Sequence, residues 1–179
     1  PPPPGPRPRD RLGAARPAGL RGLSFYAHFV MTLRMSDPDA PAALPVQPDG
    51  WPRPKGYANG WRVPAGHDLL FVAGQIGWDA DERFTSDDFV QQFEQALRNC
   101  VTVVEAAGGG PSDIVRLTMF CVDTRVYTER IEDVGAAYRR VLGKHFPTMS
   151  LIRVAGLLES RALVEIEATA ALAPRGGAS

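Results

Sequence analysis

Several features are scarce or absent in this chain of 179 residues, and each absence excludes a class of protein. No run approaches the roughly twenty consecutive apolar residues that a membrane-spanning helix needs. The 20 basic and 20 acidic residues cancel, so no excess of charge attracts nucleic acid or an anionic membrane. The two cysteines, Cys100 and Cys121, have neither metal-site nor disulfide-framework spacing, so we expect buried thiols in a cytoplasmic protein.

Familiar catalytic motifs are lacking as well. The three histidines, His28, His67 and His145, fall in a tail, a turn and a helix, and no Gly-x-Ser-x-Gly accompanies them. The histidines and cysteines do not have the spacing of metal ligands. The glycine run at 108–110 follows a predicted helix, whereas a phosphate-binding loop precedes one, so we interpret it as a helix end. The sequence therefore predicts neither a metal nor a cofactor.

Proline is plentiful near the N-terminus. Residues 1–56 contain two proline-rich runs, a composition that favours disordered backbone. We therefore predict a disordered extension over 1–56, a folded domain over 57–172 and a flexible tail over 173–179. The chain opens with Pro rather than Met, which suggests an upstream extension with translation starting at Met31 or Met35.

From Tyr57 onward the apolar residues recur with regular periods. They predict strands over 57–63, 69–76 and 114–122, and helices over 87–107 and from Asp123 to about His145. The closing stretch, 146–172, predicts two further strands joined as a hairpin. In the second of these strands apolar residues alternate with Glu165 and Glu167, so both carboxylates share one face.

This order of elements predicts an α+β fold in which two helices cover one face of a mixed β-sheet. The other face needs a cover of its own, because its apolar residues would otherwise be exposed to water. Those residues would be Leu151, Ala155 and Leu157, or their neighbours in the opposite register. We therefore expect a homo-oligomer.

Three short motifs point to a family. They are Phe-Pro-x-x-Ser at 146–150, Val-Glu-Ile-Glu-Ala at 164–168 and Gly-Gln at 74–75. Together they resemble the Rid family of reactive-intermediate deaminases, also called RidA or YjgF, over about residues 57–172. The resemblance implies a homotrimer of chorismate-mutase-like subunits with ligand clefts between neighbours. It also implies hydrolysis of an imine or enamine to a carbonyl compound and ammonia.

The resemblance also implies roles for particular residues. Glu165 matches the glutamate that positions or activates water, and Gly74 matches the glycine whose backbone lines the cleft. Tyr57 matches a tyrosine near the N-terminal strand, while Gln75 and Ser150 belong to the matching motifs and are candidate substrate-binding residues. Structural alternatives remain open, because Glu165 can be an outward residue of an amphipathic strand and Tyr57 can pack at a sheet edge.

One departure from the family pattern concerns substrate binding. Where deaminating members have Pro-Ala-Arg, this chain has Pro147-Thr148-Met149, so the arginine that binds a substrate carboxylate is missing. A thioether carries no charge and accepts hydrogen bonds only weakly. Arg153 lies on the same face of its strand as Met149, and we consider it an anchor for a longer anionic ligand or, alternatively, an ion-pair partner at a subunit interface.

Two functions follow from these observations. The first is an imine or enamine hydrolase with an altered substrate range. The second is a non-catalytic trimer that binds a small metabolite. Both place a small-molecule ligand in a cleft between subunits, and neither involves nucleic acid or a membrane.

Overall fold

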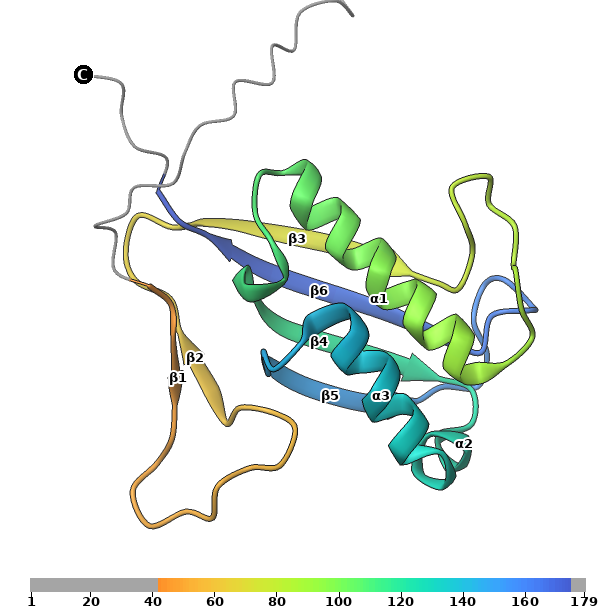
Figure 1. Ribbon diagram of the computed structural model, residues 1–179, viewed down its shortest axis with the longest axis horizontal. Helices are drawn as coiled ribbons and strands as arrows, with labels where there is room; N and C mark the ends of the chain where they lie inside the picture. The colour runs from red at the N-terminus through yellow and green to blue at the C-terminus, as the bar shows by residue number, and fades with distance from the viewer. Residues whose placement is uncertain (1–41, 175–179) are drawn as a thin grey trace, which may run out of the picture. The chain divides into compact units, whose positions relative to one another are not determined.

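The computed structural model describes residues 42–174, and all structural statements below concern that part of the chain. Residues 1–41, with the proposed starts at Met31 and Met35, and residues 175–179 of the predicted tail lie outside the described residues. The elements follow one another along the chain as Figure 1 shows: β1 (Leu44–Val46), β2 (Gly60–Arg62), β3 (Asp68–Gln75), α1 (Phe89–Ala106), a 3-10 turn (Pro111–Asp113), β4 (Ile114–Cys121), α2 (Thr124–Glu129), α3 (Ile131–Leu142), β5 (Thr148–Arg153) and β6 (Val164–Leu172).

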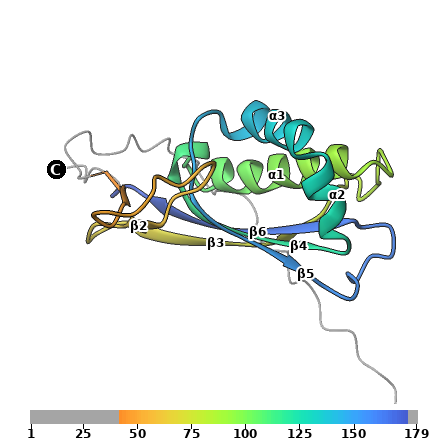
Figure 2. The same ribbon diagram turned by 90° about the horizontal axis from the view of Figure 1, so that it is seen from below.

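The main sheet has the strand order β3-β6-β4-β5. β6 pairs antiparallel with both β3 and β4, whereas β5 pairs parallel with β4. Figure 2 shows α1 and α3 on one face of this sheet, with no helix of the described part on the other. The predicted α+β fold with a mixed sheet and helices on one face is therefore confirmed.

The predicted hairpin between the last two strands is wrong. β4 lies between β5 and β6, so the two strands do not pair with each other. The connecting loop instead passes around the end of β4: Val154 N–H donates to Cys121 O at 3.0 Å, and Val122 N–H donates to Leu163 O at 3.3 Å. Alternation within a strand shows which residues share a face, but it carries no information about the neighbouring strand.

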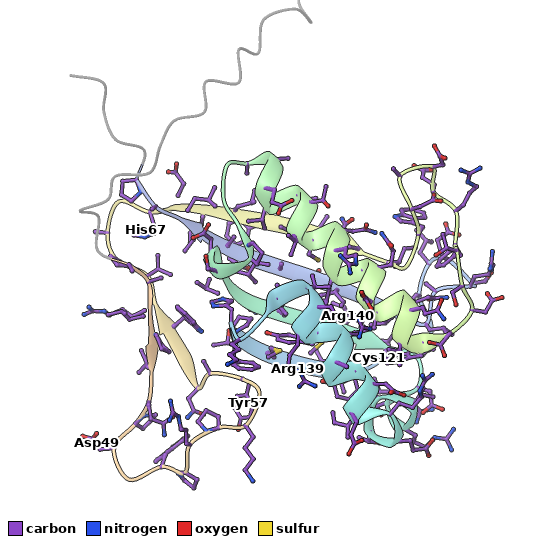
Figure 3. All side chains as sticks on the ribbon, viewed as in Figure 1. Asp49, Tyr57, His67, Cys121, Arg139 and Arg140 are labelled. Atoms are coloured by element: carbon purple, nitrogen blue, oxygen red, sulfur yellow. The ribbon has the colours of Figure 1, made fainter. Side chains whose placement is uncertain are left out.

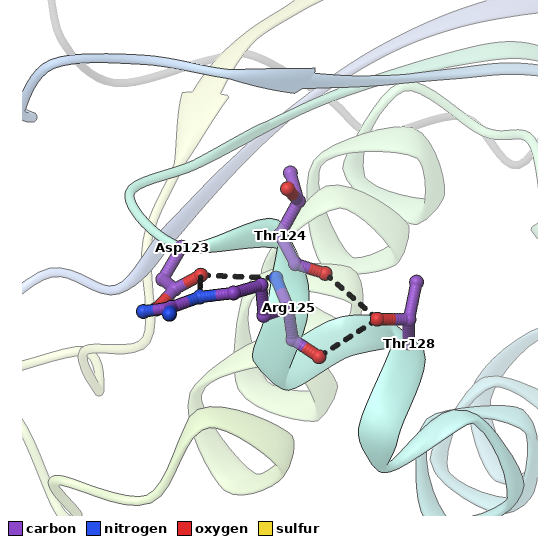
Figure 4. A network of polar contacts seen from close by, with 4 residues as sticks. All are labelled: Asp123, Thr124, Arg125 and Thr128. Atoms are coloured by element: carbon purple, nitrogen blue, oxygen red, sulfur yellow. Dashed lines mark hydrogen bonds and ion pairs between the residues drawn. The ribbon is translucent and has the colours of Figure 1, made fainter.

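The second predicted helix is interrupted. The chain begins α2 at Thr124, close to the predicted start, and Asp123 caps it by accepting a hydrogen bond from Arg125 N–H (Figure 4). At Arg130 the backbone leaves the helical range, with φ −110° and ψ 29°, and α3 follows. The Arg130 guanidinium binds Asp88 before α1 and Asp133 in the first turn of α3. These ion pairs attach the break to both helices, a tertiary effect that helical periodicity does not report.

Order begins earlier in the chain than predicted. β1 pairs antiparallel with β2, so part of the 1–56 region predicted to be disordered belongs to the folded structure. The first predicted strand, 57–63, is reduced to Gly60–Arg62. The Gln47 side chain explains why a proline-rich loop is ordered here, since its Nε2 donates to Trp51 O at 3.0 Å while its Oε1 accepts from Asn59 Nδ2 at 2.8 Å.

The core lies between the sheet and the two helices α1 and α3. The apolar stripe of α1, which includes Phe93, Leu97 and Val104, is buried against the sheet. Both cysteines are free and buried, as predicted. Burial raises the pKa of Cys100 to about 12 and that of Cys121 to about 11. No helix in the described part of the chain is long and apolar enough to cross a membrane.

The open face of the sheet is apolar in part. Phe71 is 75% exposed there and Leu69 is 54% exposed. On β5 the exposed apolar residue is Ile152, because Leu151 pairs with Met119 and packs against the core. Of the two registers considered, the structure therefore has the one in which the neighbours of Leu151, and not Leu151 itself, lie on the open face.

Candidate functional site

Glu165 and Gly74 form the closest association among the predicted site residues. Glu165 lies between Val164 and Ile166, which are both fully buried, so its side chain points to the open face of the sheet. β3 has an irregular register between Val72 and Gln75, opposite this part of β6. A β-carbon on Gly74 would lie 1.8 Å from Glu165 Oε1. The half-buried carboxylate thus occupies the space that any side chain at position 74 would need.

Gln75 and Ser150 lie at different distances from this pair along the sheet. Gln75 pairs with Ile166, next to Glu165, and its Nε2 donates to Ala73 O at 3.2 Å. Ser150 is exposed on the open face, in a row that crosses the sheet from Glu167 through Thr118. Ser150 therefore shares a face with Glu165, but β4 separates their strands.

Met149 lies on the opposite side of the sheet. It pairs with Leu117, a fully buried residue under the helices, and it packs against the core. Within one chain, Met149 and Glu165 therefore point to opposite faces.

Arg153 ends β5 on the same side as Met149, opposite Cys121. Arg153 is exposed, and its positive charge acts on the Asp123 carboxylate. The hydrogen bonds from Arg125 hold the pKa of Asp123 at about 2, and the charge of Arg153 adds to that lowering. Both roles predicted for Arg153 thus stay predictions.

Tyr57 lies apart from Gly74 and Glu165. It is on the loop that joins β1 to β2 (Figure 3) and lines a cavity formed with the segment before β5. Ala58 N–H donates to Pro147 O at 3.1 Å, which attaches this loop to the chain just before Met149. The sequence placed Tyr57 at a strand start, whereas the structure places it beside the start of β5.

The sequence pattern placed Glu167 on the same face as Glu165, but sequence reasoning missed the other polar residues around Glu167 on the open face. Arg116 and Thr118 of β4, with Glu167 and Thr169 of β6 and Phe71 of β3, line a cavity of about 400 Å³. The signal was present, since Arg116 and Thr118 are the polar positions of an otherwise apolar strand. Within residues 42–174, no group of three or more His, Cys, Asp or Glu side chains could hold a metal ion.

The fold and the motifs define a class of protein. Residues 56–172 match the family model described as Endoribonuclease L-PSP, and the chain belongs to this family, which includes the Rid and YjgF proteins. Because the family match begins at residue 56, β1 and most of the loop after it lie outside the matched region.

Individual relatives extend this comparison. A protein of Salmonella typhimurium named 2-iminobutanoate/2-iminopropanoate deaminase is 33% identical over 105 residues, which are 57% of this chain and 78% of the relative. The crystal structure of the Rid family protein YyfB from Yersinia pestis has a TM-score of 0.61 at 28% identity and covers 73% of this chain and 98% of that one. The structure of Escherichia coli TdcF with bound serine has a TM-score of 0.51 at 28% identity, covering 66% and 90%.

Proposed function

We propose that this chain hydrolyses a reactive imine or enamine to a carbonyl compound and ammonia, in clefts between the subunits of a homotrimer. The observation that carries the proposal is the Glu165 carboxylate held against Gly74 on the open face. The relative named as an imine deaminase supports the same reaction. The endoribonuclease activity in the family description has no part in the proposal, because the basic and acidic residues cancel and give no excess of positive charge to attract RNA. Buried free thiols fit a cytoplasmic location.

The proposed chemistry needs one positioned carboxylate. A water molecule held by Glu165 adds its oxygen to the imine carbon while a proton goes to the nitrogen. The carbon–nitrogen bond then breaks as the new hydroxyl passes its proton to the departing nitrogen, which leaves a carbonyl compound and ammonia. Because a protonated imine carbon is already electrophilic, positioning supplies much of the required rate enhancement.

The placement of Met149 supports a cleft between subunits and an altered substrate range. Position 149 and Glu165 face opposite sides of one sheet, so a site that uses both is assembled from two copies. At this position a methionine provides an apolar contact where a charged anchor would bind a carboxylate. We therefore expect a substrate that has no α-carboxylate or that binds through another cation, such as Arg153.

The trimer has a direct test on the open face. We expect light scattering to give three times the 19.4 kDa chain mass, because the exposed Phe71 and Leu69 need a cover. Phe71→Asp should dissociate the assembly. Leu158→Asp is the matched control: Leu158 is 97% exposed but lies in the β5–β6 loop, so this change should leave the trimer intact. A monomeric wild-type chain would refute the trimer.

Gly74→Ala tests the contact between Gly74 and Glu165. The added methyl group displaces the Glu165 carboxylate, which is the movable end of a side chain, so we expect a stability loss of about 1 kcal/mol, at the low end of the cost of overpacking. Imine hydrolysis should fall at least about tenfold, because a misplaced catalytic group loses its alignment with the substrate. Gly156→Ala, where nothing lies within 4 Å of the new carbon, should change neither property. Equal activities of the two variants would contradict the assignment.

The alternative function is binding of a small metabolite without turnover, which the missing arginine favours. Ammonia release from freshly generated 2-iminopropanoate, measured against the spontaneous rate, separates the two functions. Release above that rate supports the hydrolase. Saturable binding with no acceleration for any imine tested would support the binding protein.

A further inference from the structure

A second cavity lies away from Glu165, at the β1–β2 hairpin. Its volume is about 780 Å³, within the range of small-molecule sites, which is roughly 300–1,000 Å³. One wall comes from the loop after β1, with Trp51, Arg53 and Tyr57, and the other from the segment between α3 and β5, with Lys144 and Phe146. Trp51 and Arg53 precede residue 56, so the family match does not extend to them.

The walls of this cavity are held in place by hydrogen bonds. Gln47 bridges Trp51 and Asn59 on the hairpin side. The two walls are joined by Trp61 of β2, whose Nε1 donates to Phe146 O at 3.1 Å and whose ring centroid lies 5.0 Å from that of His145. These polar groups therefore form hydrogen bonds that hold the lining segments of the cavity in place. A preorganised cavity of this kind loses little entropy when a ligand binds.

The charges at the cavity have one sign. Arg53 and Lys144 line it from opposite walls, and within residues 42–174 neither side chain forms an ion pair or a hydrogen bond. None of the described lining residues is acidic. Asp49 belongs to the same loop but does not line the cavity (Figure 3). An anionic group would thus find two unpaired cations, whereas a cationic ligand would be repelled.

We propose that this cavity binds a small aromatic carboxylate. Trp51 and Tyr57 offer flat faces on which an aromatic ring can stack, and Phe146 adds apolar surface. Arg53 and Lys144 bind the carboxylate. Within one chain Glu165 does not line this cavity, whereas Tyr57, a candidate substrate-binding residue by the family resemblance, does. The proposal itself does not depend on imine hydrolysis.

Isothermal titration of the full chain with indole-3-acetate tests this proposal, with indole-3-acetamide as the uncharged analogue of the same shape. We expect the carboxylate to bind at least about tenfold more tightly than the amide, as a charge-assisted contact predicts. Arg53→Ala and Lys144→Ala should each weaken binding of the carboxylate about fivefold to tenfold. Trp51→Ala should weaken both compounds without disturbing the fold, because the proposed stacking surface is lost and Trp51, 64% exposed, is not part of the core.

Matched controls separate this site from general charge effects and from the Glu165 site. Lys55→Ala removes one positive charge from the same loop, but Lys55 does not line the cavity, so its affinity should equal that of the wild type. Glu165→Gln should also bind normally. Equal affinity for acid and amide, equal losses in Arg53→Ala and Lys55→Ala, or no binding of either compound at concentrations up to about 1 mM would overturn the proposal.

Discussion

Replacing Glu165 with glutamine is expected to lower the rate of ammonia release from an imine substrate by at least about 100-fold, the range that general acid–base groups contribute. The amide keeps the size of the side chain and its place against Gly74 but cannot accept a proton from water. The stability of the folded chain should change little. The measurement is initial-rate ammonia release, corrected for spontaneous hydrolysis.

Glu167→Gln is the matched control for this variant. Glu167 lies on the same strand and the same face as Glu165, two residues away, and it is exposed. We expect its activity to stay within about threefold of the wild type, since surface substitutions have small effects. If both variants lose activity equally, the effect belongs to the charge of the open face and not to one catalytic carboxylate.

Replacing Met149 with arginine is expected to raise activity on α-imino acids at least about tenfold. A charged anchor worth about 3 kcal/mol corresponds to about 100-fold in rate, so the present chain should be slower than arginine-bearing relatives by about that factor. The substitution recovers only part of it, because Met149 packs against the core and the longer charged side chain has to extend from the edge strand.

Two controls make the arginine result specific. Met149→Leu keeps an apolar side chain of similar size and should give no gain. A neutral imine without a carboxylate should also show no gain with Met149→Arg. Wild-type activity on α-imino acids that already matches the arginine-bearing relatives would show that position 149 does not serve as the anchor.

Local periodicity in the sequence was sufficient to predict several of the helices and strands. The three- and four-residue spacing of Phe93, Leu97, Cys100 and Val104 predicted α1, and the alternation around Ile166 predicted β6 and its outward carboxylates. The pairing of β5 with β4 was not accessible in this way, because register and partner depend on contacts distant in sequence. At the break, Arg130 forms an ion pair with Asp88, 42 residues away, a contact that the pattern of a single helix cannot reveal.

The candidate site was only partly accessible from the sequence. Motif positions identified Gly74 and Glu165, and the structure places them in contact. Alternation within β5 grouped Met149 with Arg153, but it did not show that this face is opposite to that of Glu165, because that relation passes through β4. The cavity at the β1–β2 hairpin was missed because proline-rich composition was interpreted as disorder.

The most direct test of a site built from two chains is a mixed assembly. One chain carries both Met149→Arg and Glu165→Gln, the other is wild type, and tags on each allow purification of assemblies that contain both. In a site between chains, the arginine introduced at position 149 of one copy meets Glu165 of the next, so ammonia release from 2-iminopropanoate per wild-type chain should rise severalfold above that of the unmixed wild type. Release per wild-type chain that never exceeds the unmixed value, in assemblies where Met149→Arg alone is activating, would contradict a site shared between subunits.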